Sequence, residues 1–229
     1  MKSEDELEKI IYGMSHDMGA PLRSIVQFSK LLLRSLEGKL SEKEAYWFQL
    51  ILDNGQQAQS MIDALIELSR IKPDKETVEP FNVAEMVAAA ISLLNTQIEE
   101  SSAKIECTGD ACEWEGNTAQ LRQCVYELVR NALIFQPENN VPQVHIHWQC
   151  RNGALTICVE DNGIGVREDK REKMVYPFQR LNGVTLYPGL GMGLAVCDRI
   201  VQNHGGEIHF RDSNLGGLAV MMELEGIQS

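Results

Sequence analysis

The sequence predicts two domains of different class, a helical hairpin followed by a domain of mixed α and β structure. Over the first 70 residues, apolar side chains recur in alternating steps of three and four, which is typical of packed helices. From Phe81 the pattern changes to helices mixed with strands that alternate polar and apolar residues. Two prolines and several charges in residues 73–80 indicate a linker. We therefore expect a hairpin over residues 1–72 and an α/β domain over residues 81–229.

The first predicted helix covers about residues 7–36. Its apolar stripe consists of Ile11, Met14, Met18, Pro21, Ile25, Phe28 and Leu32. His16 lies about 200° around this helix from Met14, so we expect its imidazole to point to solvent beside the Asp17 carboxylate. Pro21 lacks the amide that would bond the Asp17 carbonyl, which predicts a kink just after the histidine.

A turn at residues 37–41 joins this helix to a second one that ends near Ile71. Ser41 and Glu44 have the spacing of a capping box at its start. The second stripe consists of Phe48, Ile51, Gly55, Ala58, Ile62 and Leu65. Two such helices cannot cover each other's apolar faces completely. We therefore predict a homodimer, in which two hairpins form a four-helix bundle.

The second domain is predicted to contain three helices, over residues 83–99, 118–135 and 189–204. Strands are expected at residues 104–108, 112–114, 144–148, 155–159, 207–211 and 218–224. Asn152-Gly153 is a strong hairpin turn signal. Strand alternation places His145 and His147 opposite the apolar face, so we expect them to face solvent rather than to bind a metal. The polar segment 166–188 is predicted to be a lid or binding segment.

Composition restricts the possible partners and location. The formal net charge of −12 argues against nucleic acid as a partner, because phosphate backbones need clustered Lys and Arg. The apolar runs are far shorter than the ~20 residues that span a bilayer, and the charged start is unlike a secretory signal, so we expect this portion to be cytoplasmic. The six cysteines form no CxxC pair, and we expect reduced core thiols rather than disulfides or zinc ligands.

Three clusters in the second domain carry the candidate chemistry. Glu127 and Asn131 are four residues apart on one helix face, where their oxygens could hold hydrated Mg²⁺, although a plain polar face has the same pattern. The stretch 161–165, Asp-Asn-Gly-Ile-Gly, ends a strand and could offer a carboxylate to an exocyclic amine such as that of adenine, or form a simple turn. The glycine-rich stretch 189–194 opens a helix, where free amides favour phosphate. It differs from the dinucleotide fingerprint, and no Walker-type lysine is present.

In this order and spacing, the three clusters resemble the N, G1 and G2 boxes of the ATP-binding domain shared by histidine kinases, gyrase, Hsp90 and MutL. Residues 177–180, Pro-Phe-Gln-Arg, resemble the F box in the lid of that domain. The segment around His16 resembles the H box of HisKA-type two-component sensor histidine kinases. The resemblance covers essentially the whole chain and implies a dimeric four-helix bundle followed by a Bergerat-type α/β sandwich that binds ATP.

The resemblance also implies a role for each matching residue. His16 would be the phosphoacceptor, Asp17 would share its ring proton, and Arg180 would contact the γ-phosphate. Asn131 would coordinate Mg²⁺, with Glu127 assisting through water. The nucleotide-binding residues would be Asp161 for the adenine amine, Gly163 and Gly165 for the shape of the pocket, and Gly189, Gly191 and Gly193 for the phosphates.

Two positions depart from the family pattern. Ile134 stands where many N boxes have a lysine, so one phosphate contact is missing and we expect weaker nucleotide affinity. Ala20 stands one turn after His16, where many HisKA proteins have Thr or Asn to orient a water, so we expect weak phosphatase activity.

The implied reaction is autophosphorylation of His16 by ATP, followed by transfer to an aspartate on the receiver domain of a response regulator. That receiver is expected to dock near Arg23, Ser24 and Gln27. An upstream sensor domain outside this chain, which could tether a longer protein to a membrane, would supply the stimulus. Two alternatives stay open: an ATPase of the same superfamily with Glu127 as general base, and a non-catalytic dimeric scaffold that binds a regulator.

Overall fold

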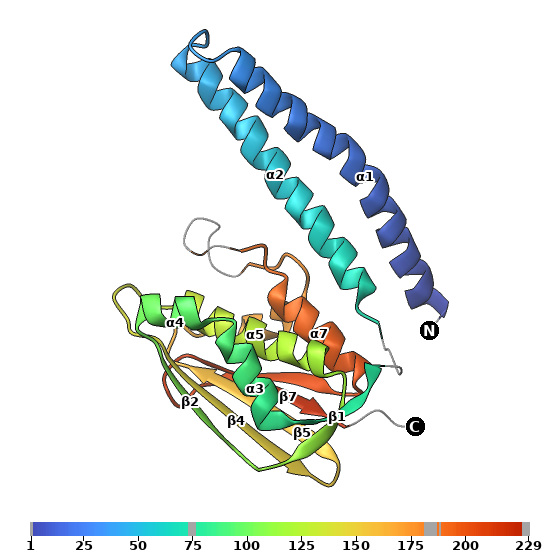
Figure 1. Ribbon diagram of the computed structural model, residues 1–229, viewed down its shortest axis with the longest axis vertical. Coiled ribbons are helices and arrows are strands. Elements are labelled where there is room, and N and C mark those ends of the chain that lie inside the picture. Colours follow the sequence, from blue (N-terminus) through green and yellow to red (C-terminus); the bar gives the residue numbers. More distant parts are fainter. Residues whose placement is uncertain (1, 73–76, 181–186, 188, 226–229) are drawn as a thin grey trace. The chain divides into compact units, whose positions relative to one another are not determined.

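The computed structural model describes residues 2–72, 77–180, 187 and 189–225, without the side chains of residues 2–12, 14 and 16 (Figure 1). The chain divides into two compact units, Met1–Ile71 and Lys72–Ser229, and each is described here by itself. Within the described part of the chain, no helix combines the length and the apolar character needed to cross a membrane.

The first unit is a helical hairpin of α1 (Lys2–Ser35) and α2 (Glu42–Arg70), as the sequence predicts. The capping box at the start of α2 is confirmed: the Glu44 amide donates to Ser41 Oγ at 3.3 Å, and the Ser41 amide donates to Glu44 Oε2 at 2.8 Å. Gly38 adopts a φ of 73° in the turn, a conformation that favours glycine. Helix α1 continues unbroken through Pro21 and curves gradually (Figure 1).

The apolar stripe predicted for α1 is not the one that is buried within the hairpin. Met18, Ile25, Phe28 and Leu32 are between 47% and 63% exposed. From Ser15 to the end of the same helix the buried and half-buried positions, again spaced by four and three, are Ser15, Gly19, Leu22, Val26, Ser29 and Leu33, and Leu36 directly after the helix continues the pattern. A β-carbon on Gly55 of α2 would lie only 2.9 Å from Val26 Cγ2, so the two helices approach closely at this level. Both stripes of α1 contain many apolar residues, so periodicity alone does not tell which of them packs against α2 within the hairpin.

The second unit contains seven strands. These are β1 (Glu79–Asn82), β2 (Lys104–Gly109), β3 (Glu113–Gly116), β4 (Gln143–Arg151), β5 (Ala154–Asp161), β6 (Glu207–Asp212) and β7 (Leu218–Leu224). The helices are α3 (Val83–Ser92), α4 (Asn95–Ser101), α5 (Thr118–Ile134), α6 (Glu168–Arg171), the 3-10 helix η2 (Glu172–Val175) and α7 (Gly193–Asn203).

The strands form a small and a large sheet. In the five-stranded sheet the order is β2-β4-β5-β7-β6, with β2 parallel to β4 and the other pairs antiparallel. Helices α3, α5 and α7 lie on one face of this sheet (Figure 1). Fully buried side chains from both layers, among them Leu121, Ile146, Ile157, Ile200 and Met222, form the core. The α/β sandwich predicted from the sequence is confirmed.

Strand alternation and the central turn also agree with prediction. Val144, Ile146 and Trp148 are buried, whereas His145 and His147 alternate with them on the opposite face of β4. Asn152 and Gly153 have φ of 53° and 85°, so both central residues of the β4–β5 turn lie in the left-handed region that an Asn-Gly hairpin turn requires.

Three element boundaries differ from prediction. Glu79 and Pro80, expected in the linker, begin β1, which pairs antiparallel with β3. The single helix predicted over residues 83–99 is divided into α3 and α4, because fully buried Leu94 adopts a non-helical φ of −109° between them. Helix α7 begins at Gly193 rather than Gly189, because Gly189 and Gly191 have φ of 127° and 73°, which an α-helix does not accommodate.

The expectation that all six cysteines are reduced is wrong for one pair, because Cys112 and Cys150 form a disulfide. Strand β2 runs parallel to β4 with Gly109 opposite Trp148, so the chain that follows β2 passes beside the end of β4. The spacing of the two cysteines along the sequence gives no indication of this. The free thiols are exposed Cys107 and buried Cys124, Cys158 and Cys197.

Candidate functional site

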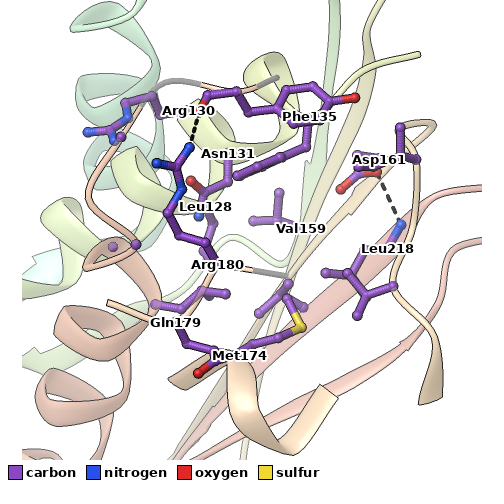
Figure 2. Close-up of a pocket in the computed structure, with 18 of the residues that line it drawn as sticks. Leu128, Arg130, Asn131, Phe135, Val159, Asp161, Met174, Gln179, Arg180 and Leu218 are labelled. Atoms are coloured by element: carbon purple, nitrogen blue, oxygen red, sulfur yellow. Dashed lines mark hydrogen bonds between the residues drawn. The ribbon is translucent and has the colours of Figure 1, made fainter. Parts of the chain in front are cut away.

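A pocket in the second unit lies between α5, the carboxy-terminal end of β5, the amino-terminal end of β7 and the glycine-rich turn before α7 (Figure 2). Predicted site residues that line it are Asn131, Asp161, Gly165, Arg180, Gly189, Gly191 and Gly193. Much of the remaining wall is apolar and comes from residues such as Leu128, Val159, Met174, Leu218 and Val220. The structure therefore brings together three clusters that are well separated in the sequence.

Asp161 supplies a fixed carboxylate to this pocket. Its Oδ1 accepts hydrogen bonds from the amides of Gly163 at 2.8 Å and Leu218 at 3.1 Å. Burial raises the pKa of this carboxyl group, and the two amides oppose that effect. With Oδ1 held in place, the carboxylate is oriented to accept a further hydrogen bond from a ligand donor.

Two glycines allow the backbone to pass close to this carboxylate. A β-carbon on Gly163 would lie 2.4 Å from the Phe135 carbonyl oxygen, and one on Gly217 would lie 2.0 Å from Asp161 Oδ1. Gly163 is thus required for the contact between the end of β5 and the end of α5, and it does not line the pocket itself. Gly217 was missed by the sequence analysis, because its proximity to Asp161 depends on the pairing of β5 with β7.

Glu127 lies behind the pocket rather than in its wall. Its Oε2 is buried, and within the described part of the chain no donor hydrogen-bonds to it, although Arg130 Nη1 lies 3.4 Å away. Burial raises the pKa of this carboxyl group, and the charge of Arg130 partly offsets the effect. A β-carbon on Gly193 would lie 2.6 Å from Oε2, so glycine allows the start of α7 to approach α5.

Glu127 and Asn131 together offer oxygen donors that suit Mg²⁺. Both side chains project from the same face of α5, and Asn131 lines the pocket. Mg²⁺ prefers carboxylate and amide oxygens and usually keeps several waters. Glu127 Oε1 accepts a hydrogen bond from Arg130 at 3.5 Å, whereas Oε2 accepts none within the described residues, so Oε2 and the Asn131 amide oxygen are a compatible pair.

Two arginines line the pocket of this acidic chain. Arg130 is half-exposed and extends from α5, and Arg180 donates a hydrogen bond to the Tyr187 carbonyl. Figure 2 shows both on the side of the pocket opposite Asp161. Arg130 was missed by the sequence analysis, although its spacing of three residues from Glu127 predicts the observed ion pair. The pocket therefore has a carboxylate on one side and two cations on the other.

The glycine-rich turn is bonded to the segment that precedes it. The Phe178 amide donates to the Gly191 carbonyl at 3.1 Å, and a β-carbon on Gly191 would lie 2.8 Å from the Gln179 carbonyl oxygen. Helix α7 begins immediately afterwards at Gly193, and the first amides of a helix have no partner within the helix. These amides and the helix dipole favour an anionic group at this end of the pocket.

The remaining predicted catalytic residues belong to the hairpin unit. His16 and Asp17 lie on α1, where Asp17 is exposed and the side chain of His16 lies outside the described residues. Ala20, Arg23, Ser24 and Gln27 follow on the same helix and are exposed. The part of the segment 166–188 that falls at residues 181–186 and 188 also lies outside the described residues.

Two protein families match successive parts of the chain. Residues 6–74 match the His Kinase A (phospho-acceptor) domain, HisKA. Residues 116–226 match the histidine kinase-, DNA gyrase B-, and HSP90-like ATPase domain, HATPase_c.

Curated proteins are similar to this chain over most of its length. The chain is 30% identical over 215 residues to phytochrome-like protein Cph1 of Synechocystis sp., covering 94% of this chain and 28% of that protein. It is 29% identical over 222 residues to histidine protein kinase DivJ of Caulobacter vibrioides, covering 94% of this chain and 37% of DivJ. The chain thus spans less than two fifths of either relative.

The fold is similar to that of full-length ShkA in complex with AMPPNP, with a TM-score of 0.67 and 19% identity over 96% of this chain and 46% of ShkA. It is also similar to histidine kinase AdeS of Acinetobacter baumannii, with a TM-score of 0.62 and 15% identity over 91% of this chain and 98% of AdeS.

Proposed function

The chain belongs to the two-component sensor histidine kinases, and we propose that it transfers the γ-phosphoryl group of ATP to His16 and then to an aspartate of a response regulator. The observation that carries this proposal is the polarity of the pocket. It combines a fixed carboxylate, an apolar wall and two arginines beside a glycine-rich helix start. A nucleotide has matching parts, namely an exocyclic amine, a flat base and a chain of phosphates.

In the proposed complex, adenine lies against the apolar wall and its amine donates to Asp161. Arg180 and the amides near Gly191 and Gly193 bind the phosphates. Arg130 is included in this set because it lines the same side of the pocket, and it partly replaces the lysine that is absent at Ile134. The similar ShkA structure is a complex with AMPPNP, an analogue of ATP, and this supports the assignment of the pocket to a nucleotide.

Mg²⁺ would be held by Asn131 and, through water, by Glu127, and it would neutralise negative charge on the phosphates. Because Glu127 lies behind the pocket wall, we assign it to a water-mediated contact rather than to direct coordination. Gly193 is required here, since any β-carbon would displace the Glu127 carboxylate.

The transfer step requires a neutral imidazole at His16. One ring nitrogen attacks the γ-phosphorus, a P–N bond forms, and the bond to the β–γ bridging oxygen breaks so that ADP leaves. Asp17, next in sequence on the exposed side of α1, shares the proton of the other ring nitrogen. A carboxylate of the receiver domain then attacks the phosphohistidine, and its product is an aspartyl phosphate.

Two partners follow from the hairpin unit. The exposed stripe of Met18, Ile25, Phe28 and Leu32 is too apolar to remain in water, and a second copy of the hairpin would cover it as a four-helix bundle. The receiver domain would dock on the exposed polar side chains Arg23, Ser24 and Gln27, which follow His16 on α1. A sensor domain outside this chain would control the reaction, and we assign this portion to the cytoplasm, where ATP is available.

The test is incubation of the purified protein with γ-labelled ATP and Mg²⁺. We expect label on the protein that is acid-labile and that disappears in His16→Gln, while that variant still binds nucleotide. Release of free phosphate without retained label would support the ATPase alternative, with Glu127 as general base. No label and no hydrolysis would support a scaffold instead, and label that survives in His16→Gln would overturn the assignment of the acceptor.

A further inference from the structure

The face of the large sheet that the helices leave uncovered carries an unusual set of side chains. On β4 and β5, the residues of this face include His145, His147, Cys158 and Glu160. His209 and Arg211 of β6 point to the same face. His209 pairs with Met221 of β7, which pairs with Cys158, and Arg211 pairs with Ala219 of β7, which pairs with Glu160. The nucleotide pocket lies on the other face, so its chemistry does not explain these residues.

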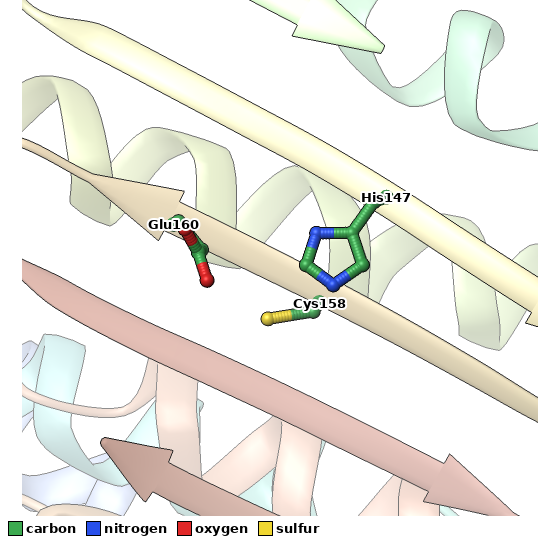
Figure 3. A group of neighbouring side chains, drawn as sticks. All are labelled: His147, Cys158 and Glu160. Carbon is green, nitrogen blue, oxygen red and sulfur yellow. The ribbon is translucent and has the colours of Figure 1, made fainter. Parts of the chain in front are cut away.

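Three of these side chains converge (Figure 3). His147 lies directly opposite Cys158 in the β4–β5 ladder, and Glu160 follows Cys158 by two residues on the same face. One ligand atom from each, a ring nitrogen, the thiol sulfur and a carboxylate oxygen, all lie within 4.8 Å of one another. Cys158 and Glu160 are buried, whereas His147 is half-buried and leaves a route to solvent.

We propose that His147, Cys158 and Glu160 form a binding site for Zn²⁺ on the outer face of the sheet, with water as the fourth ligand. Zinc commonly binds imidazole nitrogen, thiolate sulfur and carboxylate oxygen in tetrahedral sites. Bonds of about 2.0–2.3 Å place tetrahedral ligand atoms about 3.5 Å apart, so the three side chains need to converge by only about 1 Å. The hydrogen-bonded pairing of β4 with β5 fixes the backbone at these residues, so only the side chains need to move.

The donor set selects zinc over the magnesium that accompanies ATP. Mg²⁺ demands octahedral oxygen ligands, and a thiolate with an imidazole does not provide them. Zinc binds cysteine as the thiolate, so binding of the ion releases the thiol proton of Cys158 to solvent as the Zn–S bond forms.

Arg211 is the group that Zn²⁺ must displace. Its Nη2 lies 2.7 Å from Glu160 Oε1 and 3.9 Å from Cys158 Sγ, so the guanidinium neutralises the cluster where a cation would bind. Its side chain is 53% exposed, whereas that of Glu160 is 6% exposed, so the arginine can move into solvent when the ion enters. Removal of Arg211 should therefore strengthen zinc binding at this cluster.

The whole chain is first treated with a chelator to remove bound metal. Its Zn²⁺ affinity is then measured by competition with a chromophoric chelator. The type of ligand is identified separately, from the thiolate-to-metal absorption band of the protein loaded with Co²⁺. We expect one Zn²⁺ per chain, unaffected by excess Mg²⁺, with a cobalt–thiolate band. His147→Ala and Cys158→Ala should each weaken binding by more than the roughly 10–100-fold that loss of an outer-shell partner costs. Arg211→Gln should tighten it.

His145→Ala is the matched control, because His145 lies on the same face of the same strand and contacts Glu106 at 3.0 Å outside the cluster. Its zinc affinity should equal that of the parent chain. His147→Ala changes a half-buried position, so it keeps the test valid if Cys158→Ala fails to fold. The proposal would be overturned if His147→Ala and Cys158→Ala bound Zn²⁺ as tightly as the parent protein does. A Co²⁺ spectrum without thiolate absorption would overturn it as well.

Discussion

Gly217 and Asp161 are in contact across the β5–β7 pairing: the Gly217 amide donates to the Asp161 carbonyl at 3.0 Å, and the space beside the Gly217 α-carbon is occupied by Asp161 Oδ1. The carboxylate that we assign to adenine is therefore positioned partly by the absence of a side chain on the neighbouring turn.

Gly217→Ala should move the Asp161 carboxylate and weaken nucleotide binding. A β-carbon would lie 2.0 Å from Oδ1, so we expect about 1–3 kcal/mol of destabilisation from overpacking. Loss of a charge-assisted hydrogen bond to the base is worth about 1.5–3 kcal/mol, or roughly 10–100-fold in affinity. Urea unfolding and nucleotide titration measure the two effects. Asn214→Ala, at an exposed position in the same turn, should change neither, and parent-like nucleotide affinity in Gly217→Ala would contradict the assignment of Asp161.

Arg130→Gln should weaken binding of ATP by about tenfold or more and leave binding of adenosine unchanged. The guanidinium lines the phosphate side of the pocket, and a charge-assisted hydrogen bond contributes about 1.5–3 kcal/mol. Calorimetric titration with both ligands separates the contributions of base and phosphate. Arg122→Gln, exposed on the same helix, serves as the control. Equal losses for ATP and adenosine would show that Arg130 acts on the base or on the fold.

Glu127→Gln should change how the stability of the protein depends on pH. Burial raises the pKa of Glu127 above its ordinary value of 4.5, so the folded state binds this proton more tightly than the unfolded state does. Stability from this group is thus fully present below pH 4.5 and is lost as pH rises through the raised pKa. The glutamine variant lacks that loss, so its advantage in the free energy of unfolding should grow with pH and then level off.

Urea titrations between pH 4 and pH 8 measure this difference. Glu138→Gln, at an exposed position, should give a difference that does not vary with pH. An advantage of Glu127→Gln that is constant across the range would show that Glu127 has no raised pKa in the folded protein.

Phe28→Asp should convert the dimer into monomers. Phe28 is 63% exposed in the single chain, and burial of a Phe side chain contributes about 1.5–3 kcal/mol. In a symmetric dimer the substitution removes Phe28 from both protomers, so its effect on the free energy of association counts twice. We therefore expect the dissociation constant of the dimer to rise more than about 100-fold. Light scattering over a range of concentrations measures this, with Lys30→Asp on the same helix as control. A dimer that persists in Phe28→Asp would place the interface elsewhere.

Local patterns in the sequence predicted those parts of the fold that depend on local rules. The capping box at Ser41, the Asn-Gly turn and the alternation along β4 are each determined by residues a few positions apart. The resemblance of the three clusters in the second domain to the N, G1 and G2 boxes also implied an ATP-binding sandwich. Their convergence on one pocket places Asn131, Asp161 and Gly191 together, although their individual roles stay predictions.

Features that depend on pairing between distant segments could not be predicted. The disulfide between Cys112 and Cys150 follows from the parallel pairing of β2 with β4, and the contact of Gly217 with Asp161 follows from the pairing of β5 with β7. The zinc ligands illustrate the same limit: alternation correctly placed His147 on the outer face of β4, but the proximity of Cys158 depends on the β4–β5 register.

Helix α1 carries two neighbouring stripes, one packed within the hairpin and one left exposed, and both belong to a single continuous helix. A twist of that helix about its long axis cannot alter one stripe without altering the other. A rotation applied at the amino-terminal end of α1 would therefore act on the packing against α2 and on the proposed dimer interface together, and it would also turn His16, the proposed phosphate acceptor.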